Sequence, residues 1–396
     1  MSTIEPISTR LPEVDQSLTV DDIMALAAQA ENVLDQIRDA MLEPYPRKKA
    51  PMFTSASVAT LCGLDKARLK YLSANGKLPA GTSRGAGRAK EYTLEEAIVC
   101  IQATSKRPTR PPGKRGRVYA IANFKGGVTK TTTTVATAQA LSLLGRRVLV
   151  IDSDPQGSST QLLGYSPETE VNDDQTLLPL FYGEASSLAG SIRETYWHNV
   201  DLVPASISLS DSDFAVISML LKDRHFEFWD ILNKGLAAHL NDYDVVIIDT
   251  PPALGQITTN CLAAADAIVL PCPPEGLDFA SSTQFWRLFS EVARRLPGVR
   301  EHKRYDFVNV LMTKAKNTEQ SRVVQGWLQK AYGTRVLPIS IPDSSVQAGA
   351  AAMLSTIYDL SKSDVNSQSY ARIREPFDQL ADYLDSQLVR AWAREV

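Results

Sequence analysis

Cysteine and histidine are scarce in this chain, which has four of each among 396 residues. No two cysteines stand in a Cys-x-x-Cys spacing, and the histidines are scattered at positions 198, 225, 239 and 302. Zinc sites and iron–sulfur clusters need closely spaced ligands of these types, and disulfide scaffolds need many cysteines. The sequence therefore argues against all three. We expect a reducing cytoplasm, with buried thiols at positions 62, 100, 261 and 272.

Long apolar runs are missing as well. No segment approaches the roughly 20 apolar residues of a transmembrane helix, and the polar, acidic N-terminus is unlike a signal peptide. We find no internal repeat. With 396 residues, 44% of them hydrophobic, the chain is long enough for two or three domains with a large core.

A glycine-containing loop stands between a predicted strand and a predicted helix. The sequence Lys-Gly-Gly-Val-Thr-Lys-Thr-Thr occupies positions 125–132, after the apolar run 118–122 and before the apolar-periodic segment 135–144. Small residues let backbone N–H groups turn toward a phosphate, and the following helix adds the positive end of its dipole. In such loops the lysine, here Lys130, reaches the β- and γ-phosphates, and the next hydroxyl, here Thr131, holds Mg²⁺. For the motif alone, a turn that binds nothing is the alternative.

Two further apolar runs end in carboxylates. Residues 148–151 lead into Asp152 and Asp154, and residues 245–248 lead into Asp249. Because the carboxyl ends of buried parallel strands meet at one edge of a sheet, we expect these side chains near the glycine loop. A single strand of this kind usually ends in a capping aspartate, but three strand ends consistent with one nucleotide favour a binding site.

The three motifs together, KGGVTKTT, IDSDPQG and VVIIDTPP, resemble the ParA partition ATPases within the wider ParA/MinD group. The resemblance covers roughly residues 116 to 396. The loop departs from the ordinary Gly-x-x-x-x-Gly-Lys-Ser/Thr pattern at Phe124 and Thr129 and has the additional lysine, Lys125, of the deviant Walker family. The family implies a nucleotide sandwich dimer with ATP at the interface, and slow hydrolysis that a partner protein and DNA stimulate.

The resemblance also implies roles for individual residues. Lys125 would be the signature lysine that reaches the partner's nucleotide, Lys130 the phosphate-loop lysine, and Asp154 the residue that positions the attacking water. Mg²⁺ would be held by Thr131, Asp152 and Asp249, with Asp249 as the Walker B carboxylate. ATP or ADP would be bound by Lys125, Gly126, Gly127, Val128, Thr129, Lys130, Thr131, Thr132, Pro342 and Asp343.

Two departures from the family affect the expected site. Many members have glycine just before the second lysine; Thr129 stands there, so we expect a negative φ at this residue. Relatives often contact adenine through an asparagine after the strand at 307–313, where this chain has Thr313 and Lys314. The residues that contact the base are therefore left open.

Charge is distributed unevenly along the chain. Residues 47–117 contain 16 basic and four acidic side chains, a surplus of 12 positive charges. Because the whole chain has a net charge of −3, the remainder has a net charge of −15. This asymmetry indicates a basic module for polyanions attached to an acidic ATPase body.

The basic segment has the pattern of a winged helix-turn-helix. The segment begins with a short helix at 53–62 that has a hydroxyl cap, followed by a turn at 63–65 and a second helix at 66–75. A basic glycine-rich segment at 80–90 and a Thr-x-x-Glu capping box at 93–96 come next. The second helix would enter the major groove, and the basic segment would contact the backbone or minor groove. A small helical domain with a solvated basic face is the alternative. The predicted DNA-binding residues are Ser55, Lys66, Arg68, Lys70, Lys77, Arg84, Arg88 and Lys90.

The remaining segments complete the predicted organisation. Residues 1–18 read as disordered, 19–45 as a dimerisation helix, 46–103 as the winged helix-turn-helix domain, 104–117 as an extended basic linker with possible phosphate contacts, and 118–396 as the ATPase domain. The helix has a heptad-like seam with alanines, which suggests a close helix pair; packing onto its own chain is the alternative. The seam consists of Val20, Ile23, Ala27, Ala30, Leu34, Ile37 and Met41.

Near the C-terminus, an apolar helical face is decorated by acidic residues, so we expect it to pack on the ATPase core rather than lie on a membrane. The face consists of Phe377, Leu380, Leu384, Leu388 and Trp392. Basic side chains before it are candidates for sequence-independent DNA contact, although solvated surface is the usual position of such groups. They are Lys314, Lys316, Arg322, Lys330 and Arg335.

The sequence thus predicts a doubly wound, mostly parallel α/β domain of deviant P-loop type, preceded by an all-α or winged helix-turn-helix domain and a dimerisation helix. The predicted function is that of a cytoplasmic, nucleoid-associated DNA-partition ATPase. It would form a homodimer, respond to a ParB-like centromere-binding protein, bind operator and non-specific DNA, and repress its own operon. A MinD-like membrane-positioning ATPase and a metabolic deviant-Walker enzyme are the alternatives.

Overall fold

The computed structural model describes residues 19–42, 48–83, 90–360 and 365–395. It divides into two units, Met1–Arg47 and Lys48–Val396. The first unit contains helix α1 (Val20–Leu42), which begins as predicted, because the Thr19 hydroxyl accepts a hydrogen bond from the backbone N–H of Asp22 and the Asp22 carboxylate accepts one from that of Thr19. Val20 and Ile23 of the predicted seam are 72% and 57% exposed. Residues 1–18 and the side chains of Ile37 and Met41 lie outside the described residues, so dimerisation stays a prediction.

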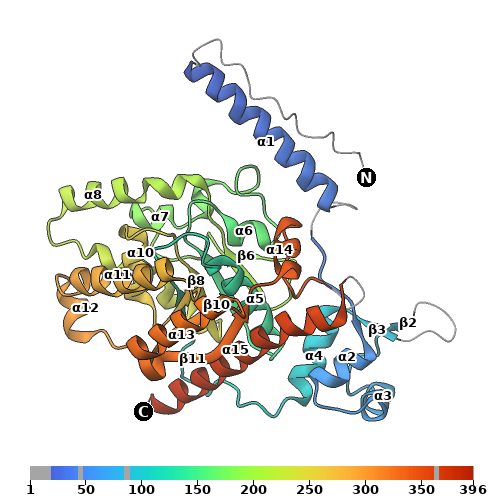
Figure 1. The fold of residues 1–396 in the computed structure, drawn as a ribbon. Coiled ribbons are helices and arrows are strands. Elements are labelled where there is room, and N and C mark those ends of the chain that lie inside the picture. The colour runs from blue at the N-terminus through green and yellow to red at the C-terminus, as the bar shows by residue number, and fades with distance from the viewer. Residues whose placement is uncertain (1–18, 43–47, 84–89, 361–364, 396) are drawn as a thin grey trace. The chain divides into compact units, whose positions relative to one another are not determined.

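The second unit is built on an eight-stranded sheet with the order β11-β10-β9-β4-β8-β5-β7-β6 (Figure 1). All neighbours pair in parallel except the short edge strand β6, which is antiparallel to β7. The strands are β4 (Arg117–Ile121), β5 (Val148–Asp152), β6 (Arg193–Glu194), β7 (Val200–Val203), β8 (Val245–Asp249), β9 (Ala267–Cys272), β10 (Phe307–Ala315) and β11 (Val336–Pro342). The predicted doubly wound, mostly parallel α/β fold is confirmed.

Helices cover both faces of this sheet, and the central strands are buried along their whole length. Because successive strand residues point to opposite faces, Tyr119 and Ile121 face one apolar core, whereas Val118 and Ala120 face the cores on the other side. The helices are α5 (Lys130–Ser142), α6 (Ser158–Leu162), α7 (Leu178–Phe181), α8 (Ser212–Lys222), α9 (Ile231–Leu236), α10 (Gln256–Ala264), α11 (Gly276–Ala293), α12 (Pro297–His302), α13 (Glu319–Tyr332), α14 (Ser345–Ala352) and α15 (Ser367–Arg394).

The long C-terminal helix α15 packs on the ATPase core as expected. All five residues of its predicted apolar face are at most 2% exposed, and they share a core with α5 and the central strands. Because the apolar face is buried in the core, it is not available to bind a membrane surface, which was the alternative for this segment. No helix among the described residues is long and apolar enough to span a bilayer.

The described part of the basic module, residues 48–83 and 90–104, contains three helices and a three-stranded antiparallel sheet with the order β1-β3-β2. Its elements are β1 (Phe53–Thr54), α2 (Ser55–Leu61), α3 (Lys66–Ala74), β2 (Thr82–Ser83), β3 (Lys90–Tyr92) and α4 (Leu94–Thr104). Thr54 caps α2 through the N–H of Ser57, and Thr93 forms the predicted capping box with Glu96. Helix, turn and helix therefore occur where the sequence placed them. The domain boundary at 46–103 stays a prediction.

The segment 104–117, expected to be an extended basic linker, has neither helix nor strand between the end of α4 and the start of β4, and its arginines bond to the ATPase domain. Arg107 pairs with Asp382 and Asp385, and Arg110 donates to the carbonyls of Leu240 and Tyr243. Farther along, Arg115 pairs with Asp266, and the buried Arg117 pairs with Glu395. These four arginines fasten the segment to acidic groups and carbonyls of the ATPase domain. Part of the positive surplus is therefore neutralised within the chain, and the expected phosphate contacts of this segment stay a prediction.

Candidate nucleotide-binding site

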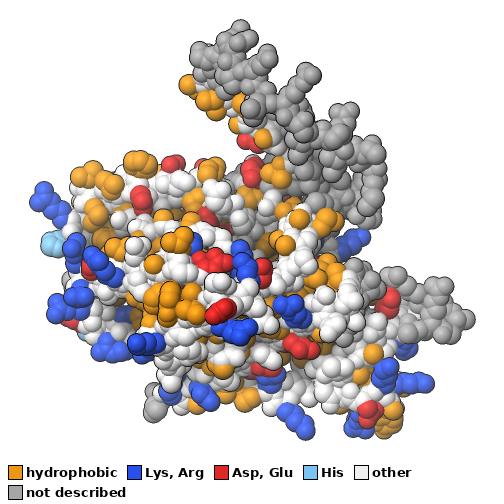
Figure 2. Space-filling view, viewed as in Figure 1, with side chains coloured by type: hydrophobic (Ala, Val, Ile, Leu, Met, Phe, Trp, Pro, Cys, Tyr) orange, Lys and Arg blue, Asp and Glu red, His pale blue; other side chains and the backbone are white. Residues whose placement is uncertain are grey.

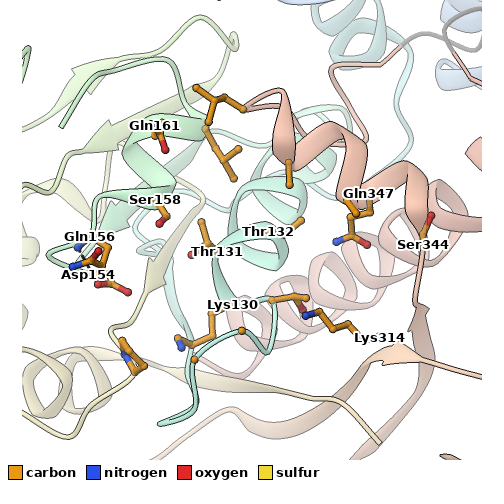
Figure 3. Close-up of a pocket in the computed structure, with 18 of the residues that line it drawn as sticks. Lys130, Thr131, Thr132, Asp154, Gln156, Ser158, Gln161, Lys314, Ser344 and Gln347 are labelled. Atoms are coloured by element: carbon orange, nitrogen blue, oxygen red, sulfur yellow. Dashed lines mark hydrogen bonds between the residues drawn. The ribbon is translucent and has the colours of Figure 1, made fainter. Parts of the chain in front are cut away.

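A cavity of about 540 Å³ opens at the carboxyl edge of the sheet (Figure 3). The loop after β4, the loop after β5, the loop after β8 and the chain after β11 contribute to its walls. Asp154 and Gln156 lie on one side and Ser344 and Gln347 on the other, with Thr131 and Thr132 between them. The predicted residues that line it are Gly126, Gly127, Thr129, Lys130, Thr131, Thr132, Asp154, Pro342 and Asp343. The cavity also has lining residues that the sequence did not single out: Gln156, Ser158, Gln161, Leu162, Pro252, Ser344, Gln347, Ala348, Ala351 and Leu354.

The phosphate loop turns through two left-handed residues, Gly127 and Thr129, each with φ of 74°. The expectation of a negative φ at Thr129 is therefore wrong. Thr129 is the N-cap of α5 and makes no side-chain capping bond, so the first N–H groups of this 13-residue helix are left for another acceptor. A tight reversal of the loop points these N–H groups into the cavity. The reversal requires a left-handed backbone at Thr129, although threonine ordinarily prefers a negative φ.

Relief of this backbone strain gives a stability prediction. Because a non-glycine residue in the left-handed region costs about 1 kcal/mol or more, Thr129→Gly is expected to raise the free energy of unfolding by about 1 kcal/mol. The control, Thr132→Gly, lies within α5 and is expected to lower it by roughly 0.3 to 0.5 kcal/mol, the difference in helix propensity between threonine and glycine. Urea unfolding of the nucleotide-free protein measures both. Equal losses in the two variants would contradict a left-handed Thr129.

Lys130 is a buried cation at the base of the cavity. It is 7% exposed, and its Nζ donates to the backbone carbonyl of Lys125 at 3.1 Å. Burial lowers its pKa, while the charges of Asp249 and Asp154 oppose that shift. A buried ammonium without a hydrogen-bonded carboxylate partner among the described residues suits a polyanionic ligand.

Two carboxylates lie side by side beneath the loop at the ends of β5 and β8. Asp152 and Asp249 are 0% and 1% exposed, and their residues are in register across the sheet. Asp152 Oδ2 accepts hydrogen bonds from the N–H and hydroxyl of Thr160 at 2.7 and 2.8 Å, and Asp249 Oδ2 accepts one from Ser159 Oγ at 2.8 Å. Asp249 Oδ1 is buried without a hydrogen-bond partner.

The electrostatics of this pair favour a bound cation. Burial, followed by the charge of Asp249, raises the pKa of Asp152 to about 8. Burial also raises the pKa of Asp249 to about 6, and the neighbouring Thr131 and Ser159 hydroxyls oppose this rise. A divalent cation beside Asp249 Oδ1 would relieve the repulsion. The Thr131 hydroxyl beside Asp249 is a further oxygen that the protein offers such a cation. The described residues contain no cluster of three His, Cys, Asp or Glu ligands.

Asp154 differs from these two carboxylates because it faces the cavity. Its Oδ1 accepts a hydrogen bond from the N–H of Gln156 at 3.1 Å, and burial raises its pKa. Its hydrogen bond leaves lone pairs that can accept a proton or orient a water molecule. Positioning of the attacking water by Asp154 stays a prediction.

Lys125 lies apart from the cavity lining. Its Nζ pairs with Asp278 Oδ2 of the same chain at 2.8 Å, and its side chain is 35% exposed. Asp278 is almost fully buried at the first turn of α11, and no signal in the sequence identified it. The predicted contact with a partner's nucleotide would require Lys125 to leave this ion pair.

Residues of β10 and α14 line the wall of the cavity where the sequence left the contacts with the base open. The Thr313 hydroxyl donates to the carbonyl of Val128 at 3.1 Å, which ties β10 to the phosphate loop. Lys314 adopts φ of 48° and lines the cavity, and its predicted contact with DNA stays a prediction. Gln347 lies on α14, where its carboxamide faces the cavity. Of the four non-glycine residues with positive φ in the described chain, Thr129, Lys314 and Leu354 line this one cavity.

The predicted DNA-binding residues form two groups. Lys66, Arg68 and Lys70 are exposed on α3, and Lys77 is exposed beyond its end. Figure 2 shows basic side chains gathered over this helix. Ser55 and Lys90 instead make contacts within the module: Ser55 Oγ donates to the carbonyl of Lys90 at 3.0 Å, and Lys90 Nζ to that of Ala80 at 2.8 Å. Arg84 and Arg88 lie outside the described residues. Among the other basic candidates, Lys316 pairs with Glu275, and Arg322, Lys330 and Arg335 are exposed.

The fold and the cavity define a P-loop nucleoside triphosphatase of the deviant type. The model of the AAA domain family matches residues 116–299. The chain is 28% identical over 367 residues to a putative replication protein A of Sinorhizobium fredii (strain NBRC 101917 / NGR234), which covers 89% of this chain and 90% of the relative. It is 27% identical over 328 residues to protein SopA of Escherichia coli (strain K12), with 80% and 82% covered.

Solved structures extend the comparison. A structure described as a partition protein matches 95% of this chain and 99% of its own with a TM-score of 0.64 and 20% identity, which shows a shared fold. A cobyrinic acid a,c-diamide synthase from Mycobacterium smegmatis, solved with a bound ATP analog and magnesium, matches 71% of this chain and 97% of its own with 30% identity and a TM-score of 0.53. The chain is thus similar over most of its length to replication and partition proteins of the ParA type.

Proposed function

We propose that this protein is a DNA-partition ATPase that dimerises around ATP and Mg²⁺ and uses the nucleotide to control its hold on DNA. Two observations carry the nucleotide part: the start of α5 and the buried Lys130 line the cavity, and the buried Asp152–Asp249 pair at the ends of β5 and β8 lies close enough for the charge of Asp249 to act on the pKa of Lys130. A polyphosphate together with a divalent cation satisfies all three groups at once. ATP and ADP fit this requirement, and the synthase structure that this chain resembles contains an ATP analog and magnesium.

The chain's own residues support hydrolysis by positioning. Lys130 and the loop N–H groups would neutralise the phosphates, and Asp154 would orient the attacking water. Thr131, Asp152 and Asp249 would hold Mg²⁺, which supplies charge neutralisation to the phosphate oxygens when bound. Phosphoryl transfer to water needs little covalent participation by the protein, so weak intrinsic turnover that rises with a ParB-like partner and DNA is consistent with this site.

Two features support DNA binding. The helix-turn-helix elements present Lys66, Arg68 and Lys70 on one exposed helix, which suits entry into a major groove and repression of the chain's own operon. Exposed Arg322, Lys330 and Arg335 on the ATPase domain suit sequence-independent contact. The exposed seam of α1 suits a homodimer. These properties together describe a cytoplasmic protein that associates with the nucleoid.

The two alternatives have less support. A MinD-like membrane role requires an exposed amphipathic C-terminal helix, whereas the apolar face of α15 is buried. A metabolic enzyme has one specific observation in its favour, the 30% identity to the diamide synthase structure. That reading gives no role to the basic module, which lies outside the matched AAA domain region at residues 116–299.

Retention on DNA tests the proposal against both alternatives. Random-sequence duplex DNA fixed to a support is expected to retain the protein with Mg-ATP and to release it with Mg-ADP. Retention should fall steeply between 50 and 200 mM salt, by roughly 10³-fold if about six phosphates are contacted. An Arg322→Ala, Lys330→Ala double variant should lose retention while still binding ATP. Equal retention with the two nucleotides, or none, would contradict the proposal.

A further inference from the structure

A buried polar cluster touches the helix that follows the phosphate loop at a point remote from the phosphate end. The carboxylate of Asp359 is its centre: Oδ2 pairs with Lys48 Nζ at 2.7 Å, and Oδ1 accepts hydrogen bonds from Tyr196 OH at 2.6 Å and Gln139 Nε2 at 3.4 Å. Thr356 joins through its hydroxyl, which donates to Gln139 Oε1 at 2.5 Å. We call these five residues the Asp359 cluster.

The cluster is rigid because its charges are buried and paired. The side chains of Lys48 and Asp359 are 12% and 7% exposed, and Lys48 Nζ also lies 4.7 Å from the centre of the Tyr196 ring. Burial lowers the pKa of Lys48, and the charge of Asp359 opposes this shift. Loss of either partner would leave the other charge buried and unpaired. A movement of one member therefore displaces the others.

Three connections join the cluster to the nucleotide cavity. Gln139 lies on α5, whose first residues line the cavity. Lys48 Nζ donates to the carbonyl of Leu162 at 3.0 Å, and Leu162 lines the cavity from α6. Thr356 stands two residues after Leu354, whose left-handed backbone brings it to the cavity wall. A shift of α5, α6 or Leu354 on ligand binding would therefore act on Asp359 through Gln139, Lys48 or Thr356.

The opposite side of the cluster leads into the basic module. Lys48 lies two residues before Ala50 and five before Phe53, and both of these pack against the core that the module shares with α5 and α15. The far end of the module is held as well: Gln102 Nε2 of α4 donates to the carbonyl of Gly145 at 3.2 Å, just beyond α5. Arg107 then shares Asp385 with Arg146. The module is therefore attached on both sides to α5 or its immediate C-terminal continuation.

We propose that occupancy of the nucleotide cavity is transmitted to the helix-turn-helix module through α5 and the Asp359 cluster, with Lys48 as the positioning residue. This inference rests on the proposed function, since it assumes that the cavity takes ATP or ADP. The route is continuous, because the buried Asp359 carboxylate bonds to Lys48 in the segment leading into the module, to Gln139 on the phosphate-loop helix and to Thr356 beside the cavity-lining Leu354.

Amide hydrogen exchange on the full chain, with and without Mg-ADP, tests the route. In the wild-type protein, Mg-ADP is expected to slow exchange in the phosphate loop and to change the exchange of α2 and α3 by about threefold or more. In Lys48→Met, which keeps the methylene packing but removes the charge, the loop should still be protected and the response of α2 and α3 should fall below about 1.5-fold. Lys49→Met, an exposed neighbour, is the matched control and should behave as wild type.

The outcomes separate the inference from the proposed function. A wild-type loop that Mg-ADP leaves unprotected would overturn the proposed function, and the inference with it. A protected loop without any response in α2 and α3, or a full response in Lys48→Met, would overturn the inference alone. Asp359→Asn keeps an acceptor for Tyr196 and should reproduce the loss of response, with native folding checked by thermal unfolding. A normal response in a folded Asp359→Asn would also overturn the inference.

Discussion

Replacement of Lys130 by methionine is expected to abolish measurable ATP binding, with a loss in affinity of at least about 100-fold, or about 3 kcal/mol. The reason is that Lys130 is the buried cation at the base of the cavity, where no described carboxylate forms a hydrogen bond with it. Methionine keeps the buried methylene groups, so the nucleotide-free fold should be retained. Because burial lowers the pKa of Lys130 and so disfavours its charge, the variant should be at least as stable as the wild type without ligand. Titration with a fluorescent ATP analogue measures the affinity.

Lys106→Met is the matched control, because Lys106 is exposed and is not among the residues that line the cavity. It should bind the analogue as the wild type does. An affinity of Lys130→Met within about threefold of wild type would show that the triphosphate lies elsewhere and that the cavity is not the nucleotide site.

Replacement of Asp154 by alanine is expected to keep ATP binding and remove turnover. Asp154 faces the cavity but does not belong to the Asp152–Asp249 pair or to the anion-binding groups. ATP affinity should therefore stay within about threefold of wild type, whereas the single-turnover rate should fall by about 100-fold or more, as expected for loss of a water-positioning base. The variant should accumulate in its ATP form and remain on DNA in Mg-ATP.

Phosphate release after mixing excess enzyme with ATP measures this rate without a partner protein. Asp174→Ala, a change at an exposed acid outside the cavity lining, serves as the control. Normal hydrolysis in Asp154→Ala would show that another group positions the water.

The strand ends were predictable because they combine two strong signals. Apolar runs such as 148–151 and 245–248 form fully buried parallel strands, and such strands bring their carboxyl ends to one edge. The sequence pattern alone therefore placed Asp152 and Asp249 next to each other, and the structure pairs them across β5 and β8. The capping signals of α2 and α4 were equally local, because Thr54 and Thr93 bond to N–H groups three residues away.

Features that depend on the tertiary structure were not predictable. The conformation of Thr129 is imposed by the loop around it, against the preference of the residue. The sequence assigned Arg107 and Arg115 to a basic module for polyanions. In the structure they pair with Asp385 and Asp266, which are too distant in sequence for a local pattern to reveal them. Asp278 and Lys48 gave no sequence signal for the same reason, since their partners Lys125 and Asp359 are distant in sequence.

We propose that two copies of this chain share ATP at their interface and that assembly of this dimer controls DNA binding. A crystal structure with a non-hydrolysable ATP analogue and magnesium tests this proposal most directly. We expect Lys125 to leave Asp278 and to place its Nζ within about 3 Å of a γ-phosphate oxygen on the nucleotide of the second copy. A structure in which both copies hold the analogue and Lys125 stays paired with Asp278, far from either γ-phosphate, would contradict the account.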